Sequence, residues 1–271
     1  SLLLSLLLIL GASFSSSAQE VSEELTANYK VSGDFTLGIN NKYGEIEILN
    51  WEKNALDVHV LITVEAKDEE KSSKVLEGIE IDIEEAPDGV YYTTHFGKSN
   101  MNNVKINVKY TVKMPEGLNV DLVQAYGDLF VQKVSGVADL TVKYGHLKVT
   151  ELARGDREPW NTLNLSYGKG TLEKVGNLDI QVAYSELTIQ ESSALQIENA
   201  YSKVFGHKAG SVTTEGEKDK YVFDAVEAFS GMLKYSVVQI GNLSQKLELE
   251  LAYTNATIEK VKADFQEIGR A

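Results

Sequence analysis

The sequence predicts an all-β protein built as a single-stranded β-helix, or β-solenoid, with coils of about 18 residues. An N-terminal β-rich segment that contains one short helix is predicted to precede the coils. Three observations lead to this fold class. Apolar residues alternate with polar ones in run after run, most runs contain a tyrosine followed by a small residue, and these tyrosines recur at a nearly constant interval. Alternation with a period of two is typical of β-strands with one buried face.

The repeat is clearest around Tyr144. Counted from this tyrosine, apolar residues stand at −4, −2, +3 and +5, where the sequence has Leu140, Val142, Leu147 and Val149. The same template fits around other tyrosines, and a weaker copy is centred on Lys218. The tyrosines at the repeat centres are Tyr43, Tyr126, Tyr144, Tyr167, Tyr184, Tyr201, Tyr235 and Tyr253. From residue 126 to residue 253, seven intervals cover 127 residues, an average of about 18. A period of this size indicates coils that bury their inner faces by stacking on one another.

The chain is expected to turn a corner just after each repeat centre, because the apolar positions change from even offsets before the tyrosine to odd offsets from +3 onward. Small residues at +1 are expected to allow this corner, with glycine taking a positive φ. They are Gly127, Gly145, Gly168, Ser185, Ser202, Ser236 and Thr254. The phase of the repeat groups the tyrosines with the inward set. We therefore expect their rings to close the core, and the stacking of sugars on these rings is the alternative.

Three segments are predicted along the chain. Residues 1–18 resemble the end of a signal peptide, with an apolar stretch followed by small residues, so the protein is expected to be exported to the periplasm, the cell surface or the medium. Residues 19–117 form the N-terminal β-rich segment, with its helix expected within 66–77, and residues 118–265 form the repeat array. No apolar run is long enough to cross a bilayer, so no transmembrane segment is expected in the mature chain.

Charge stripes mark two strands of the N-terminal segment. Acidic residues alternate with isoleucine over 79–84, and lysines alternate with apolar residues over 105–113. Stripes of opposite sign and equal period are expected to face the same way on one sheet and to form cross-strand ion pairs.

Composition excludes several classes of function. The chain of 271 residues has 26 basic and 40 acidic residues, a net charge of −14, which repels phosphate backbones, so nucleic acid is excluded as a partner. It contains no cysteine, which excludes thiol nucleophiles, zinc–thiolate sites and disulfides.

Several short motifs resemble a known family. NNKYGEIEILNWEKN (40–54), KVLEGIEIDI (74–83), YTVKMPEGLNVDL (110–122) and the repeated Tyr-Gly steps are similar to the "putative adhesin" β-solenoid domain of exported bacterial proteins, including many from Bacteroidota. The resemblance implies a right-handed β-helix-like fold and a location in the envelope or at the cell surface. It implies no catalytic residues.

The longest interval between repeat centres from residue 126 onward, from Tyr144 to Tyr167, contains the sequence RGDREPW. Its extra residues predict a loop that leaves the coil and forms a candidate binding patch. The residues of this patch are Trp160, Arg154, Asp156 and Arg157. Arg-Gly-Asp is also an integrin-binding tripeptide, but a chance match of three residues explains it better.

Neither a metal site nor a catalytic centre is predicted. Asp121, Asp139 and Asp179 recur at position −5 and suggest a calcium site, but a solvated acidic face fits better because no glycine-rich aspartate repeat is present. The four histidines fall on separate strands and coils, and the sequence has no HExxH, GxSxG or P-loop motif. No metal, cofactor or catalytic residue is therefore assigned.

The sequence is best explained by an exported, non-enzymatic β-solenoid that acts as an adhesin-like interaction or scaffold module. A β-helix enzyme that degrades polysaccharides and an envelope-sensing module are the alternatives. The partner stays unknown at this stage, with a surface glycan and an envelope protein as the two candidates.

Overall fold

The protein folds almost entirely into β-strands. A computed structural model describes residues 19–98, 101–262 and 266–267, so the predicted signal peptide, residues 1–18, lies outside the described residues. The N-terminal elements are β1 (Gln19–Lys30), β2 (Thr36–Asn50), β3 (Ala55–Ala66), α1 (Glu69–Leu76), β4 (Ile79–Ala86), β5 (Gly89–Phe96) and β6 (Lys105–Met114). The strands that follow are β7 (Asn119–Val134), β8 (Ala138–Lys143), β9 (His146–Leu152), β10 (Asn161–Ser166), β11 (Lys169–Ala183), β12 (Glu186–Ala200), β13 (Lys203–Glu217), β14 (Lys220–Lys234), β15 (Val237–Ala252), β16 (Asn255–Val261) and β17 (Gln266–Glu267). The predicted all-β class with one short helix is confirmed.

Antiparallel pairs dominate the N-terminal segment: β1 pairs with β3, β3 with β6, and β4 with β5. The helix α1 begins after Asp68, whose carboxylate accepts a hydrogen bond of 2.9 Å from the backbone N–H of Lys71. Glu69 and Glu70 stand in its first turn, where acidic side chains stabilise the positive end of the helix dipole.

Strand β2 joins this segment to the coils. It pairs in parallel with β7 from Thr36 opposite Asn119 to Ile48 opposite Val131, although the two strands are far apart in sequence. The repeat around Tyr43 therefore lies directly beside the repeat around Tyr126. One continuous hydrophobic core runs through both parts, from Ala27 to Leu243.

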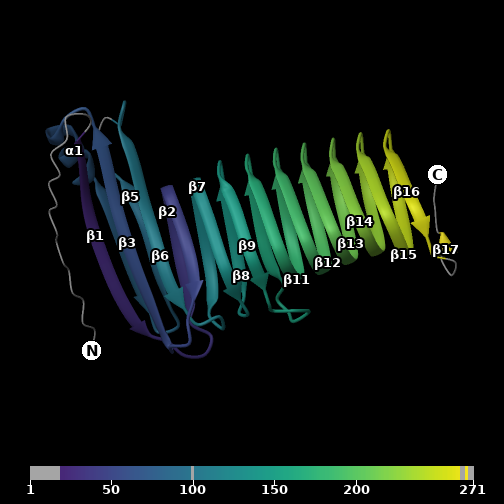
Figure 1. Cartoon of the computed structure of the whole chain (residues 1–271), viewed down its shortest axis with the longest axis horizontal. Coiled ribbons are helices and arrows are strands. Elements are labelled where there is room, and N and C mark those ends of the chain that lie inside the picture. Colours follow the sequence, from purple (N-terminus) through teal and green to yellow (C-terminus); the bar gives the residue numbers. More distant parts are fainter. Residues whose placement is uncertain (1–18, 99–100, 263–265, 268–271) are drawn as a thin grey trace.

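From β7 onward, strands of neighbouring coils pair in parallel, so that each residue lies opposite its counterpart one repeat away. Leu187 in β12 lies opposite Val204 in β13, and Val204 lies opposite Tyr221 in β14, a shift of 17 residues each time. Figure 1 shows these coils following one another along the long axis, with the N-terminal strands at one end. Each coil has two strand sides whose inward residues, such as Leu172 and Ile180 in β11, are fully buried. Burial of alternate residues explains the period of two in the sequence.

The corner lies at the tyrosine itself. All eight repeat tyrosines and Lys218 have φ between 51° and 62°, so the expectation of a positive φ at +1 is wrong. The expectation of inward rings is also wrong, since the tyrosines of the coil array are exposed, from 47% at Tyr144 to 81% at Tyr253. The reason is that a left-handed residue interrupts the regular alternation of a strand, so the side chain at this position leaves the inward set.

The small residues at +1 have a different role. A Cβ added to Gly127 would overlap the carbonyl oxygen of Gly44 in the neighbouring coil, so the backbones approach too closely for a side chain at this point. In later coils a hydroxyl takes this place. The Ser185 hydroxyl accepts a hydrogen bond of 3.0 Å from the N–H of Gly168 and donates one of 2.8 Å to the carbonyl of Ala183. Hydrogen bonds of this kind link one corner to the next.

Candidate functional site: an exposed tyrosine ridge

Five exposed tyrosines at successive corners form one continuous stack, which we call the tyrosine ridge: Tyr126, Tyr144, Tyr167, Tyr184 and Tyr201. Their ring centroids are separated by 4.8, 4.8, 5.1 and 5.0 Å in turn, and their planes deviate by 8° or less. The spacing follows from the strands, which lie about 4.8 Å apart in a sheet. Because every corner has the same backbone conformation, the rings repeat with the coils.

The faces of these rings point at one another, and their edges and hydroxyls point to solvent. Tyr43 extends the stack at its N-terminal end, with its ring 5.4 Å from that of Tyr126 and tilted by 34°. The Phe96 ring and the Lys42 ammonium in turn contact Tyr43, at 5.4 Å and 4.6 Å from its centroid. A sugar that stacks on a tyrosine face therefore has no free face within the ridge.

The ridge ends at Lys218, which replaces tyrosine at the next corner. Its ammonium lies 4.7 Å from the centroid of the Tyr201 ring and donates a hydrogen bond of 2.8 Å to the Tyr201 hydroxyl. This hydrogen bond raises the pKa of Lys218, so the side chain stays cationic. Beyond the interruption, Tyr235 and Tyr253 form a second stack with centroids 5.0 Å apart.

The coil that carries Lys218 also differs from its neighbours in its interior. Asp219 stands at +1, where neighbouring coils have serine, and its buried carboxylate accepts a hydrogen bond of 2.8 Å from the N–H of Ser202. Its second oxygen is buried without a hydrogen-bond partner. Burial raises the pKa of Asp219 to about 6. Gly216 makes the arrangement possible, because a side chain there would collide with this carboxylate and with the hydroxyl of Tyr221.

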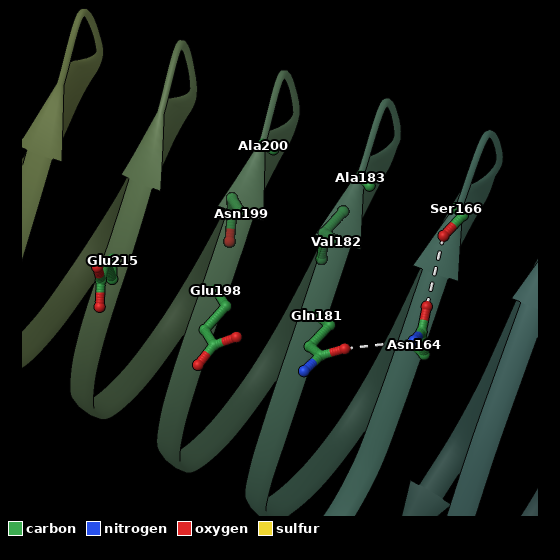
Figure 2. A pocket seen from close by; sticks show the side chains of 9 residues that line it. All are labelled: Asn164, Ser166, Gln181, Val182, Ala183, Glu198, Asn199, Ala200 and Glu215. Atoms are coloured by element: carbon green, nitrogen blue, oxygen red, sulfur yellow. Dashed lines mark hydrogen bonds between the residues drawn. The ribbon is translucent and has the colours of Figure 1, made fainter.

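A groove of about 560 Å³ lies on the face that leads up to the ridge corners (Figure 2). Small residues at position −1 leave this space open, namely Ser166, Ala183 and Ala200. Hydrogen-bonding side chains at position −3 follow one another along it, namely Asn164, Gln181, Glu198 and Glu215. The groove thus offers amides and carboxylates on the strands that lead into the tyrosine corners.

The arginines of the predicted binding loop contact the loop itself. Arg154 donates hydrogen bonds of 2.8 Å and 2.7 Å to the carbonyls of Pro159 and Glu158. Arg157 donates to the carbonyls of Arg154 and Ser135, at 2.9 Å and 3.0 Å. Asp156 is exposed and Trp160 is half-buried. A binding role for these residues stays a prediction, with Asp156 and Trp160 as the side chains most available for it.

Of the three aspartates at position −5, Asp121 and Asp139 lie in adjacent strands, and Thr162 of β10 separates Asp139 from Asp179. Asp121 is opposite Asp139, which accepts a hydrogen bond of 2.6 Å from the Thr162 hydroxyl. Burial, together with the charge of Asp139, raises the pKa of Asp121. Across residues 19–98, 101–262 and 266–267, no three His, Asp or Glu side chains form a group suited to a metal ion.

Three histidines are paired separately: His59 with Glu24, His146 with Asp128, and His207 with Asp224. Within the described part of the chain, no helix combines the length and the apolar character needed to cross a membrane.

No protein-family model and no curated protein matches the sequence. Several solved structures are similar to it. A "putative adhesin" from Bacteroides fragilis is 11% identical, with 91% of this chain and 97% of that chain covered and a TM-score of 0.36. A "putative lipid binding protein" from Parabacteroides distasonis is 13% identical, with 90% and 96% covered and a TM-score of 0.37. A "putative adhesin" from Parabacteroides merdae is 17% identical, with 88% and 96% covered and a TM-score of 0.33. Two of these three names are the family name that the sequence resemblance indicates.

Proposed function

We propose that this chain is an exported, non-enzymatic β-solenoid that serves as an adhesin-like interaction module of the bacterial envelope, with the tyrosine ridge as its contact surface. The parallel pairing of strands one repeat apart supports the solenoid. The apolar leader in residues 1–18 supports export. In this proposal, residues 19–117 close one end of the core, and residues 118–265 form the array.

The exposed stack of tyrosines carries the proposal. A left-handed backbone costs roughly 1–2 kcal/mol for a residue other than glycine, so tyrosine at all corners but that of Lys218 is an unfavourable choice for a turn. Stacking offsets part of this cost, at about 0.5–1.5 kcal/mol for each aromatic pair. Nearly half of each ring nevertheless stays in solvent, where it contributes no burial. A contiguous exposed aromatic surface of this kind is typical of contact sites.

A surface glycan is the partner that fits this surface best. The ridge presents phenolic hydroxyls at a regular spacing of about 5 Å. The adjacent groove adds the amides of Asn164 and Gln181 and the carboxylates of Glu198 and Glu215. Such a row of donors and acceptors matches a polymer with many hydroxyl groups, and the hydroxyls of tyrosine exchange hydrogen bonds readily with those of sugars.

A glycan array tests the proposal. The protein is expected to bind a subset of bacterial surface glycans, and a variant in which Tyr144, Tyr167 and Tyr184 are all changed to serine is expected to lose at least tenfold in affinity. Circular dichroism establishes that the variant retains its strands. Tyr91→Ser is the matched control, since it removes an exposed tyrosine outside the ridge, and Trp160→Ala tests the loop as the alternative contact.

Four results contradict the proposal. Equal binding by the ridge variant and the wild type removes the ridge as the contact surface, and a loss confined to Trp160→Ala places the contact in the loop instead. Release of fragments from a bound polysaccharide shows an enzyme. Failure to bind any glycan, with saturable binding to a purified envelope protein, removes the glycan as the partner.

A further inference from the structure

The interruption of the tyrosine stack leaves two ring faces without an aromatic neighbour. Tyr184 covers one face of Tyr201, and Tyr253 covers one face of Tyr235. The other faces of Tyr201 and Tyr235 look toward the corner of Lys218 between them. Since these two tyrosines belong to coils two repeats apart, their rings are separated by about two strand spacings, or roughly 10 Å. One ring of ordinary thickness fits into such a gap, as each tyrosine of the ridge does between its neighbours.

A flexible side chain occupies the gap. Lys218 has the same left-handed backbone as the tyrosines, with φ of 62°, so its side chain enters the space where a ring is missing. Its ammonium donates a hydrogen bond to the Tyr201 hydroxyl and lies 3.6 Å from a carboxylate oxygen of Glu217. Both contacts are at the surface, where ion pairs contribute little, so a ligand displaces this side chain at small cost.

Positive charge gathers around the gap in a protein of net charge −14. Lys203 and Lys220 lie opposite each other in adjacent strands just after the corner, and Lys234 stands just before the Tyr235 corner, with its ammonium 5.3 Å from that ring. Lys218 is the fourth cation, and all four side chains are exposed. Two acidic residues stand next to these lysines: Glu217 beside Lys218, and Glu186 opposite Lys203 in the neighbouring strand. Local charge of this kind attracts an anion even when the protein as a whole repels it.

We propose that the gap between Tyr201 and Tyr235 binds a six-membered ring that carries a carboxylate, as in a uronic acid unit of an acidic glycan. The sugar ring lies between the two tyrosine faces, which attract its polarised C–H groups through their negative charge. Lys218 swings out of the gap, and its ammonium, with those of Lys203, Lys220 and Lys234, surrounds the carboxylate. This inference rests on the proposed function and names the chemical class of the glycan.

The interior of the same coil supports a specialised corner. Three inward positions differ together from the neighbouring coils: glycine at 216, aspartate at 219 and tyrosine at 221. Asp219 and Tyr221 require glycine at 216, because a side chain there would collide with the carboxylate of Asp219 and the hydroxyl of Tyr221. The loss of the ring at Lys218 is therefore one part of a coordinated change in this coil.

The test measures binding of oligogalacturonate to the whole protein by calorimetry. A neutral oligosaccharide with the same ring size is the first comparison and is expected to bind at least tenfold more weakly. Binding of the acidic ligand is expected to weaken as salt is raised from 50 to 300 mM, because exposed charges are screened beyond about 10 Å at 0.1 M. Benzoate is the second comparison and shows whether an aromatic acid uses the same gap.

Lys218→Tyr is the decisive variant, because it fills the missing place in the stack with the residue found at the other corners. Its affinity for oligogalacturonate is expected to fall at least tenfold, while its near-ultraviolet circular dichroism shows the longer tyrosine stack. Lys208→Gln is the matched control: it removes one exposed lysine away from the gap and is expected to bind as the wild type does.

Unchanged binding by Lys218→Tyr overturns this site. If the triple serine variant of the ridge then still loses glycan binding, the proposed function of the ridge stands, and only the site at Lys218 is rejected. If no glycan binds to the wild type, both fail. A preference for benzoate over oligogalacturonate contradicts the assignment to an acidic sugar.

Discussion

The Asp219 carboxylate accepts a hydrogen bond of 2.8 Å from the backbone N–H of Ser202. The coils on either side use a serine hydroxyl for the same bond, as Ser202 does toward Ser185 at 3.2 Å. A hydroxyl also donates to the carbonyl two residues before it, which Ser202 does toward Ala200 at 2.9 Å. An ionised carboxylate has no proton to donate. Asp219 therefore matches the role of serine only when it is protonated.

The stability of the protein is expected to depend on the protonation of Asp219. Its pKa rises from an ordinary 3.8 to about 6 in the folded state, so the folded state binds the proton more tightly than the unfolded state. The resulting stabilisation is fully present below about pH 4 and is lost as the pH rises through 6. Asp219→Ser is expected to raise the free energy of unfolding at pH 7.5 by on the order of 1–2 kcal/mol.

Urea denaturation at several pH values measures this effect. The difference in unfolding free energy between Asp219→Ser and the wild type is expected to shrink as the pH falls from 7.5 to 4. A constant difference over this range would show that Asp219 has an ordinary pKa. Asp179→Ser is the control, because this aspartate of β11 is exposed.

Gly127→Ala is expected to destabilise the protein. The added Cβ meets the backbone carbonyl of Gly44, which cannot move aside without separating two coils. Overpacking of this kind costs typically about 1–3 kcal/mol. Gly117→Ala is the matched control, since no atom lies within 4 Å of its added Cβ, and thermal unfolding compares the two. Equal melting temperatures would mean that the corners are spaced more loosely than described.

The left-handed conformation at the corners predicts an unusual order of stability at Tyr184. Both Tyr184→Asn and Tyr184→Val lose the stacking on Tyr167 and Tyr201, at 5.1 Å and 5.0 Å. Asparagine tolerates a positive φ, whereas a β-branched residue does not, so the valine variant is expected to be less stable by about 1 kcal/mol or more. Chemical denaturation measures the difference. A valine variant as stable as the asparagine variant argues against a φ of 51° at this residue.

Arg154→Lys is expected to loosen the loop and to leave the coils intact. The guanidinium of Arg154 binds two carbonyls at once, and lysine cannot reproduce this fork. Hydrogen exchange of the backbone amides from 153 to 160 is expected to accelerate, with a change in global stability below about 1 kcal/mol. Asp156→Asn is the control because its side chain is exposed. Slow exchange that persists in Arg154→Lys would show that the loop is held by other contacts.

Local patterns were sufficient to predict the corners. The template placed a repeat centre at Lys218 although no tyrosine stands there, and its φ of 62° confirms the corner. The acidic start and later lysines of the predicted helix were equally informative, since α1 occupies Glu69–Leu76. Both signals depend on residues close together in the chain, which is why they can be read from sequence.

Strand partners over long distances were not predictable in the same way. The acidic stripe of β4 does not meet the basic stripe of β6, because β4 pairs with β5. Lys109 of β6 instead pairs with Glu45 of β2 at 2.6 Å. The expected stripe pairing is therefore wrong. Charge patterns show which face of a strand is polar but not which strand lies beside it.

By itself, the sequence determined the all-β class, the interval between repeat centres and the positions of the corners to within one residue, because alternation and small residues act on neighbouring atoms of the chain. Only the tertiary structure decided the direction of the tyrosines and the meaning of their interruption. One left-handed residue per coil turns each ring outward, and the stacking of coils then aligns rings that are 17 or more residues apart. The gap at Lys218 exists only because the rings on either side are aligned in this way.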